Sequence, residues 1–346
     1  MSCIKIKSIH FELSSHCNAA CQLCSRHVTN GNTYHKSSTL IEQDLGADFI
    51  AGLLADPLLA DCHRWLLCGI LGEPMMNPEI ADICQLFLDR NSGAPIEIHT
   101  NGGIGRVEAW QALGRMLSTQ QQNVNFSIDG LEDTNHIYRR NVRWDVIMRN
   151  LSAFIESGGY AVWKFIPFDY NLHQIDAAQQ MAKDLGCAEF KISGNVAAPK
   201  GRSSMLQPRA DLIYDPTPML PAANSDPIDL VALNSSLRLP VALDCEHLGS
   251  DQIYIDAAAR VWPCCHILSP RMSSDTRQQR LANSWLIDPY GQDWNDLRKH
   301  SLSEILAGKY WNDLYSTLVD NSGIYVCSHK CAAKQHKRTV IQLASD

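Results

Sequence analysis

Strand-like and helix-like segments alternate through the first two-thirds of the chain, and this alternation limits the fold more than any other feature. Parallel strands need long crossover connections, which helices supply, and these crossovers are right-handed. The sequence therefore predicts an α/β fold with a parallel sheet, either open and doubly wound or curled into a partial barrel. Strand patterns are expected at residues 4–13, 64–69, 95–99, 124–128, 160–166 and 188–192. Helix patterns lie at residues 41–54, 78–88, 107–117 and 145–155, and from 171 to 186, where Asn171 and Gln174 resemble a capping box.

Composition limits the classes of function. Apolar residues make up 45% of the 346 residues and charged residues 19%, as in ordinary globular proteins. A net charge of -7 argues against a general nucleic-acid binder, because phosphate binding needs clustered Lys and Arg. No run of about 18 apolar residues predicts a membrane span, and residues 1–7 lack the apolar block of a signal peptide. We therefore expect a cytoplasmic protein, in which the 13 cysteines are metal ligands or buried groups rather than disulfides.

The loop after the first predicted strand carries three cysteines, Cys17, Cys21 and Cys24, with the spacing C-x3-C-x2-C. Three thiolates on one short loop can bind three irons of a [4Fe–4S] cubane. The fourth iron then has no protein ligand, and a molecule with an amine and a carboxylate can chelate it. The alternative is a structural zinc site, closed by His16 or His27 as the fourth ligand.

This loop resembles that of the radical S-adenosylmethionine (radical SAM) superfamily. The resemblance implies a partial (β/α)6 TIM-like barrel over residues 1–198 and a reducing [4Fe–4S] cluster on Cys17, Cys21 and Cys24. S-adenosylmethionine would chelate the open iron and be cleaved to a 5′-deoxyadenosyl radical, with the electron supplied by a flavodoxin- or ferredoxin-type donor. Many members have an aromatic residue before the third cysteine, where this chain has Leu23.

Loops after the next strands resemble the superfamily's cofactor-binding motifs. Gly72 and Glu73 belong to a Gly-Glu-Pro motif in which Leu71 replaces the first glycine, and Glu73 would bind the methionine ammonium. Thr100 and Asn101 follow the third strand and would meet the ribose hydroxyls. An ordinary strand-to-helix turn is the alternative for the Gly-Glu-Pro motif.

Ser127 ends the fourth strand, and Arg139 follows a short way along the chain. By the same resemblance these two residues would contact the carboxylate of the cofactor. Arg140 is adjacent and is the alternative partner, while a solvated arginine at a helix start is the structural alternative.

The last hundred residues carry a second group of cysteines. Residues 199–243 are predicted to be a bridging segment, and residues 244–346 a small α+β domain that resembles the SPASM/twitch extension. Its hairpin, residues 252–256 and 260–262, has Ala259 where a glycine is usual. One auxiliary [4Fe–4S] cluster would be bound by Cys245, Cys264, Cys327 and Cys331, with Cys265 able to replace Cys264; a zinc ribbon is the alternative. The cysteines within apolar patterns are expected in the core: Cys3, Cys62, Cys68, Cys84 and Cys187.

The resemblance predicts radical chemistry on a ribosomally made peptide first and dehydrogenation of a small molecule, such as an alcohol, sugar or nucleotide, second. A non-catalytic iron–sulfur or zinc protein that acts as a scaffold or electron carrier is the alternative of another class. The open iron position and the Glu73 and Thr100 loops favour an enzyme, because an electron carrier needs no cofactor pocket. Neither a membrane nor a nucleic acid is expected as a partner.

Overall fold

The computed structural model describes most of the first 193 residues and separate parts of the rest. The described residues are 6–21, 24–30, 33–38, 40–193, 213–214, 251–272, 288–319 and 339–342. None of the helices in these segments is long and apolar enough to cross a membrane.

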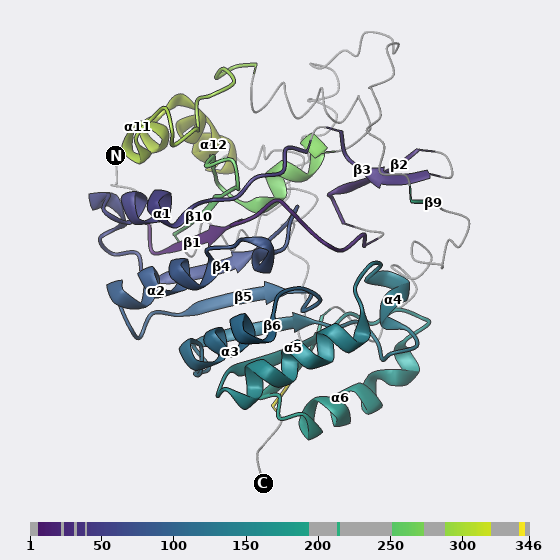
Figure 1. Ribbon diagram of the computed structural model, residues 1–346. Coiled ribbons are helices and arrows are strands. Elements are labelled where there is room, and N and C mark those ends of the chain that lie inside the picture. The colour runs from purple at the N-terminus through teal and green to yellow at the C-terminus, as the bar shows by residue number, and fades with distance from the viewer. Residues whose placement is uncertain are drawn as a thin grey trace.

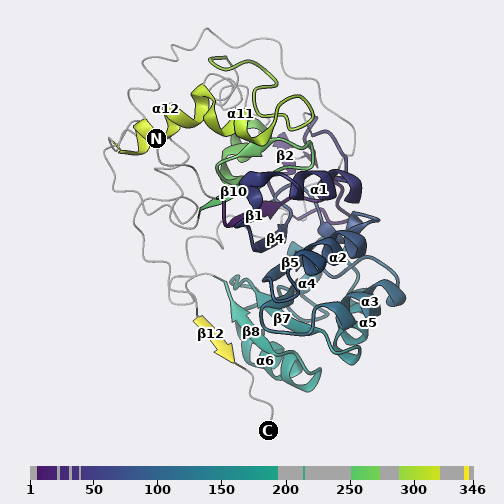
Figure 2. The same ribbon diagram turned by 90° about the vertical axis from the view of Figure 1, so that its left-hand side faces the viewer.

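A nine-stranded sheet organises the molecule, and its strand order is β11-β10-β1-β4-β5-β6-β7-β8-β12. The six strands from β1 to β8 in this order all pair in parallel, as the alternating pattern predicts. The sheet is open, since its edge strands β11 and β12 lie at opposite ends of the order (Figure 2). The described sheet is therefore an open α/β layer, consistent with the predicted partial barrel. Its strands are β1 (Ser8–Phe11), β4 (Arg64–Cys68), β5 (Ile96–Thr100), β6 (Gln122–Ser127), β7 (Tyr160–Phe165), β8 (Glu189–Ile192), β10 (Gln252–Ile255), β11 (Val261–Trp262) and β12 (Thr339–Gln342).

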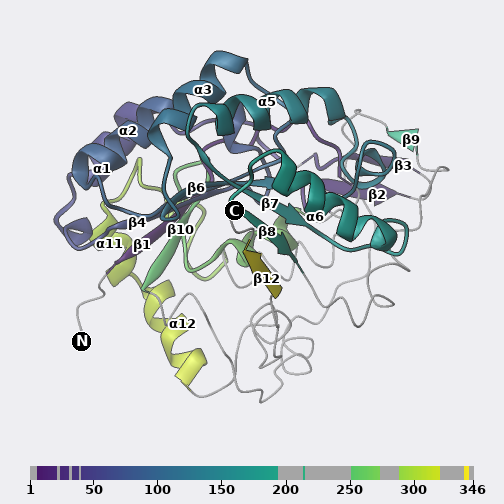
Figure 3. The same cartoon turned by 90° about the horizontal axis from the view of Figure 1, so that it is seen from below.

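Five helices cover one face of this sheet (Figure 3). They are α1 (Ala47–Leu54), α2 (Ile80–Arg90), α3 (Val107–Met116), α5 (Trp144–Glu156) and α6 (Ile175–Asp184). Aromatic rings fill the space between the layers: Trp65 of β4 stacks on Phe87 of α2 at 4.5 Å, and Phe126 of β6 lies 5.1 Å from Trp110 of α3. Since side chains alternate along a strand, the neighbours of Trp65 and Phe126 point to the opposite face.

Short helices and a second small sheet complete the first part of the chain. The 3-10 helices are Pro57–Leu59, Pro74–Met76 and Leu172–Gln174, and α4 is Asn135–Tyr138. The small sheet, which the sequence did not predict, contains β2 (His27–Asn30), β3 (Thr33–Lys36) and β9 (Ile213–Tyr214). Figure 1 shows β2, β3 and α4 beyond the carboxyl ends of the core strands.

The predicted hairpin near residue 255 is present and extends the main sheet. Strand β10 pairs in parallel with β1, so that His10 lies opposite Tyr254, and β11 pairs antiparallel with β10. Ala259 in its turn has φ +59°, the left-handed conformation that explains why a glycine is usual there. The 3-10 helix Cys265–Met272 follows, and α11 (Leu302–Ala307) and α12 (Lys309–Val319) lie near this end of the sheet (Figure 2). The bridging segment lies outside the described residues except for β9, and the domain boundaries stay predictions.

The predicted capping box at Asn171 is wrong. Helix α6 begins at Ile175, and the Asn171 side chain donates to the carbonyl oxygens of Asp129 and Ile166. Asn171 Oδ1 accepts from the Phe168 amide. The side chain thus fixes the loop after β7 instead of capping a helix.

Close packing of α3 on α5 generates a prediction about stability. A Cβ on Gly114 would lie 2.4 Å from the Phe154 carbonyl oxygen, whereas a Cβ on Gly52 meets nothing within 4 Å. We expect Gly114→Ala to destabilise by roughly 1–3 kcal/mol, because the helices must separate. Gly52→Ala is the matched control and should be neutral or stabilising by up to about 1 kcal/mol. Thermal unfolding of both variants measures this, and equal midpoints would contradict the close approach.

Candidate functional site

The three cysteines of the first loop lie at the carboxyl end of β1, between that strand and β2. Cys21 is buried, and Cys17 and Cys24 are half-buried. The charges of Cys21 and Cys24 both act on Cys17. Burial raises the pKa of Cys24 to about 11 and that of Cys17 still further. These thiols are thus expected to stay protonated until a metal ion displaces their protons, because metal binding requires the thiolate.

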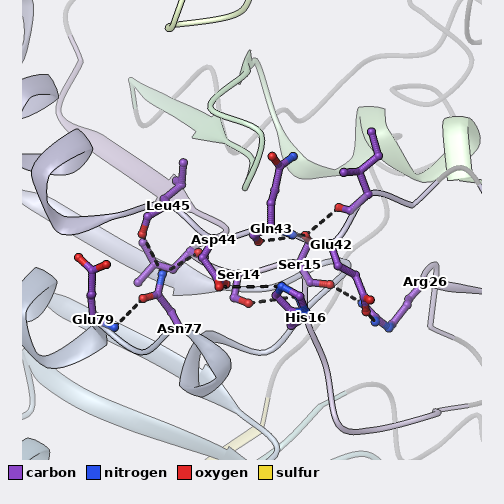
Figure 4. Close-up of polar contacts among 12 residues, drawn as sticks. Ser14, Ser15, His16, Arg26, Glu42, Gln43, Asp44, Leu45, Asn77 and Glu79 are labelled. Atoms are coloured by element: carbon purple, nitrogen blue, oxygen red, sulfur yellow. Dashed lines mark hydrogen bonds and ion pairs between the residues drawn. The ribbon is translucent and has the colours of Figure 1, made fainter.

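Buried hydrogen bonds fix the backbone on both sides of this loop (Figure 4). Ser15 pairs with Gln43 through backbone and side chain, and its hydroxyl donates to the Ile41 carbonyl at 2.9 Å. Arg26, only 3% exposed, donates to the carbonyls of Ser15 and Leu71 and pairs with Glu42. A buried arginine that is satisfied in this way holds the chain after Cys24 against the loop that follows β4.

The loop after β4 lies directly on the cysteine loop. A Cβ on Gly72 would be 2.0 Å from the Ser14 carbonyl oxygen, so only glycine fits. The Glu73 amide donates to the His16 carbonyl at 2.8 Å. Asn77 donates to the Leu13 carbonyl at 2.8 Å and the Leu45 carbonyl at 2.9 Å (Figure 4). The predicted Gly-Glu-Pro motif therefore brings the loop after β4 into backbone contact with the cysteine loop after β1.

Glu73 connects this loop to the loop after β5. Its carboxylate accepts from the amides of Met75 and Asn101, at 3.2 and 2.8 Å, and hydrogen bonds to the Thr100 hydroxyl. Burial raises the pKa of Glu73 to about 6, although these hydrogen bonds lower it. Asn101 in turn donates to Asn18 Oδ1 at 2.9 Å, within the cysteine loop. The structure thus brings Glu73, Thr100 and Asn101 together beside the cysteines.

Arg139 reaches the same place from the segment after β6. Its Nε donates to Asp129 Oδ2 at 2.7 Å, and its Nη1 lies 4.0 Å from Cys21 Sγ. Asp129 is fully buried and also accepts from the Ile166 amide at 2.7 Å. Burial lowers the pKa of Arg139, but the charges of Asp129, Cys21 and Tyr138 and the hydrogen bond to Asp129 together raise it well above its usual value. Arg139 thus lies against Cys21, and Ser127 is half-buried at the end of β6.

The donor set fits an iron–sulfur cluster. Three cysteine thiols share one loop, and the buried guanidinium of Arg139 lies beside Cys21. Within the described segments, no three His, Cys, Asp or Glu side chains lie close enough to share a single metal ion, and this holds for the three cysteines of the loop as well. A cubane has no such requirement, since each thiolate binds a different iron. Leu23 lies outside the described residues.

For the auxiliary cluster, the structure describes only part of the predicted ligand set. Cys264 and Cys265 are both buried where β11 ends. The other three predicted ligands, Cys245, Cys327 and Cys331, lie outside the described residues. This ligand set stays a prediction.

One carboxylate beneath the site was not predicted from the sequence. Glu12, 1% exposed, accepts from the Leu71 amide at 2.5 Å and from the Tyr254 hydroxyl of β10. It therefore joins the C-terminal hairpin to the loop after β4. No motif marks Glu12, and its position at the end of a buried parallel strand was the only available signal.

The predicted core cysteines divide into two groups. Cys62, Cys84 and Cys187 are buried as expected. The prediction for Cys68 is wrong: it is half-buried on the sheet face opposite Trp65 and Leu67, because side chains alternate along β4. Cys3 lies outside the described residues.

Comparisons with known proteins agree with this geometry. Residues 11–173 match the Radical SAM superfamily. A search of the curated proteins found no match. Among solved structures, Streptococcus suis SuiB bound to S-adenosylmethionine has a TM-score of 0.52 and 14% identity, over 93% of this chain and 74% of SuiB. Native anSMEcpe with bound AdoMet has a TM-score of 0.51 and 11% identity, over 94% of this chain and 89% of anSMEcpe.

The chain thus contains a radical SAM superfamily domain at residues 11–173, and this domain makes it an enzyme. Such a domain implies a [4Fe–4S] cluster and S-adenosylmethionine as cofactors. At these identities, the two solved structures show that the fold is shared.

Glu12 should make stability depend on pH. Burial raises the pKa of Glu12 from 4.5 to about 7, so the folded protein binds this proton more tightly than the unfolded chain. Its contribution to stability is full below pH 4.5 and is lost as the pH rises through 7. We expect Glu12→Gln to reduce the change in the free energy of unfolding across this pH range by about 3 kcal/mol. Thermal midpoints across this range measure it, with the exposed Glu108→Gln as control; an unchanged slope in Glu12→Gln would contradict the assignment.

Proposed function

We propose that this enzyme cleaves S-adenosylmethionine at the Cys17 loop and uses the resulting radical to modify a ribosomally made peptide. The observation that carries the proposal is the meeting of three thiols, Glu73 and Arg139 at the ends of successive parallel strands. Thiols for a cluster, a carboxylate for an ammonium and a guanidinium for a carboxylate are the groups that this cofactor needs.

Each residue has a task in this proposal. Cys17, Cys21 and Cys24 would hold the cluster, which supplies the electron that cleaves the cofactor. Glu73 binds the methionine ammonium: its carboxylate has acceptor capacity beyond its bonds to Met75, Asn101 and Thr100. Gly72 permits the close loop contact that sets the Glu73 backbone.

The remaining contacts come from the neighbouring loops. Asp129 binds Arg139 through Nε and so orients its Nη groups, which with Ser127 bind the cofactor carboxylate. Thr100 and Asn101 meet the ribose. These side chains are buried or half-buried, which helps to exclude water from the 5′ carbon of the cofactor.

The C-terminal hairpin is proposed to present an auxiliary [4Fe–4S] cluster. Cys264, at the end of β11, would be one ligand, together with Cys245, Cys327 and Cys331. Glu12 and Tyr254 support this arrangement, since they join β10 to the loop after β4.

A peptide substrate is supported by what proteins of similar fold bind. SuiB has been solved bound to precursor peptide SuiA, with a TM-score of 0.50 and 12% identity to this chain. The anSMEcpe structure with bound AdoMet and Cp18Cys peptide has a TM-score of 0.50 and 10% identity. A flavodoxin- or ferredoxin-type protein is proposed as the electron donor.

Co-expression tests the substrate class. We expect a short peptide encoded beside this gene to change mass when it is produced together with the enzyme, because radical formation on the peptide removes or relocates hydrogen. The Cys17→Ala/Cys21→Ala/Cys24→Ala variant should leave the mass unchanged, whereas Cys84→Ala, a buried cysteine in α2, should behave as the wild type. Mass spectrometry of the purified peptide gives the result. Unchanged mass for every neighbouring peptide with the wild type would contradict the peptide proposal.

A further inference from the structure

Asn18 lies between the first two cysteines of the loop after β1, and its side chain makes two hydrogen bonds to the loop after β5. Its Oδ1 accepts from Asn101 Nδ2 at 2.9 Å, and its Nδ2 donates to the Gly103 carbonyl at 3.2 Å. None of the proposed contacts to the cofactor uses Asn18. The segment that separates Cys17 from Cys21 is therefore attached to the end of another strand by a side chain that has no task in the proposed site.

Asn101 and Gly103 complete a closed ring of hydrogen bonds with Asn18. The Gly103 amide donates to Asn101 Oδ1 at 2.8 Å, so each of the three residues donates to one of the others and accepts from the third. We name these three residues the asparagine clasp. Asn101 Nδ2 keeps a second hydrogen, so the clasp is compatible with the proposed contact between Asn101 and the ribose.

The backbone on which the clasp is built is itself fixed by helix α5. Asn150 of this helix is fully buried, and its Nδ2 donates to the carbonyls of Gly102 at 2.8 Å and Ile104 at 2.9 Å. These two residues flank Gly103. Gly102 has φ +70°, and a Cβ there would lie 2.9 Å from the Phe126 ring, so the turn needs glycine. The loop after β5 therefore gives Asn18 a rigid support.

A second contact holds the other half of the segment between Cys17 and Cys21. The Ala20 amide donates to the Arg140 carbonyl at 3.0 Å, and both Ala19 and Ala20 are buried. The three intervening residues thus bind to two different loops at the carboxyl end of the sheet. Neither this bond nor the clasp involves a thiol, so both can persist when the thiols bind iron.

We propose that Asn18 is a positioning residue for the cluster: through the clasp it fixes the path of the chain between Cys17 and Cys21 before iron binds. Because ordering a loop costs conformational entropy, a segment that is ordered beforehand binds iron more tightly. Groups that orient metal ligands from outside the ligand set typically change metal affinity by about 10- to 100-fold when they are lost. The inference rests on the proposed cluster for the effect on iron, and on the hydrogen bonds alone for the effect on the loop.

Hydrogen exchange in the iron-free chain tests the positioning without a cluster. The Ala20 amide, followed by mass spectrometry of overlapping peptides, should exchange at least about tenfold faster in Asn18→Ala than in the wild type, because two hydrogen bonds are lost. The matched control is Asn123→Ala at the amino end of β6. Asn123 is also half-buried, donates to the Gln120 carbonyl and accepts from Asn125. This control should leave Ala20 exchange unchanged, and wild-type exchange in Asn18→Ala would overturn the proposal.

Asn18→Asp separates the two bonds of the Asn18 side chain. The aspartate keeps an oxygen that accepts from Asn101, but it loses the amide that donates to Gly103. The rate of Ala20 exchange should therefore increase from the wild type through Asn18→Asp to Asn18→Ala. Any other order would contradict a clasp in which both bonds restrain the segment.

Iron release then measures the effect on the cluster. The anaerobically reconstituted proteins are mixed with a chelator of ferrous iron, and the phase that belongs to this cluster is the one that the Cys17→Ala/Cys21→Ala/Cys24→Ala variant lacks. This phase should be at least about tenfold faster in Asn18→Ala and unchanged in Asn123→Ala. Equal rates in Asn18→Ala and the wild type would overturn the effect on the cluster. If the wild type shows no such phase, the proposed function fails, while the exchange result still decides whether Asn18 positions the segment.

Discussion

The site depends on the close contact between the loop after β1 and the loop after β4. Arg26 is buried there and donates to the carbonyls of Ser15 and Leu71, so one side chain satisfies acceptors on both loops. Gly72 allows the backbones to touch, and the Glu73 amide donates to the His16 carbonyl. The positions of the three cysteines follow from these contacts, because a short polar loop has no regular structure of its own to hold it.

From this contact, hydrogen bonds continue across the ends of the following strands. Glu73 binds the Asn101 amide after β5, and Asp129 after β6 aims Arg139 at Cys21. Glu12 extends the same connection to Tyr254 in the C-terminal hairpin. The rigid parallel sheet places these loops side by side. One sheet therefore positions all the loops of the candidate cofactor site.

Much of the strand and helix order could be predicted from the sequence, because buried parallel strands and amphipathic helices leave clear apolar patterns. The loop motifs at Cys17, Glu73 and Thr100 were also recognisable. Cys68 was not, because residues 65–68 read as one apolar run and only the register with β5 reveals which face each side chain takes. Arg26 and Asn77 were missed because their partners are backbone carbonyls distant in sequence, which no spacing pattern records.

The most direct measurement is the anaerobic production of 5′-deoxyadenosine by the reconstituted enzyme with S-adenosylmethionine and dithionite. The account predicts that the wild type makes it, quantified by mass spectrometry. The variant without Cys17, Cys21 and Cys24 should make none, while it keeps about half of the iron of a two-cluster protein. If neither protein makes 5′-deoxyadenosine although both bind iron or zinc tightly, the cysteines are structural and the central claim is contradicted.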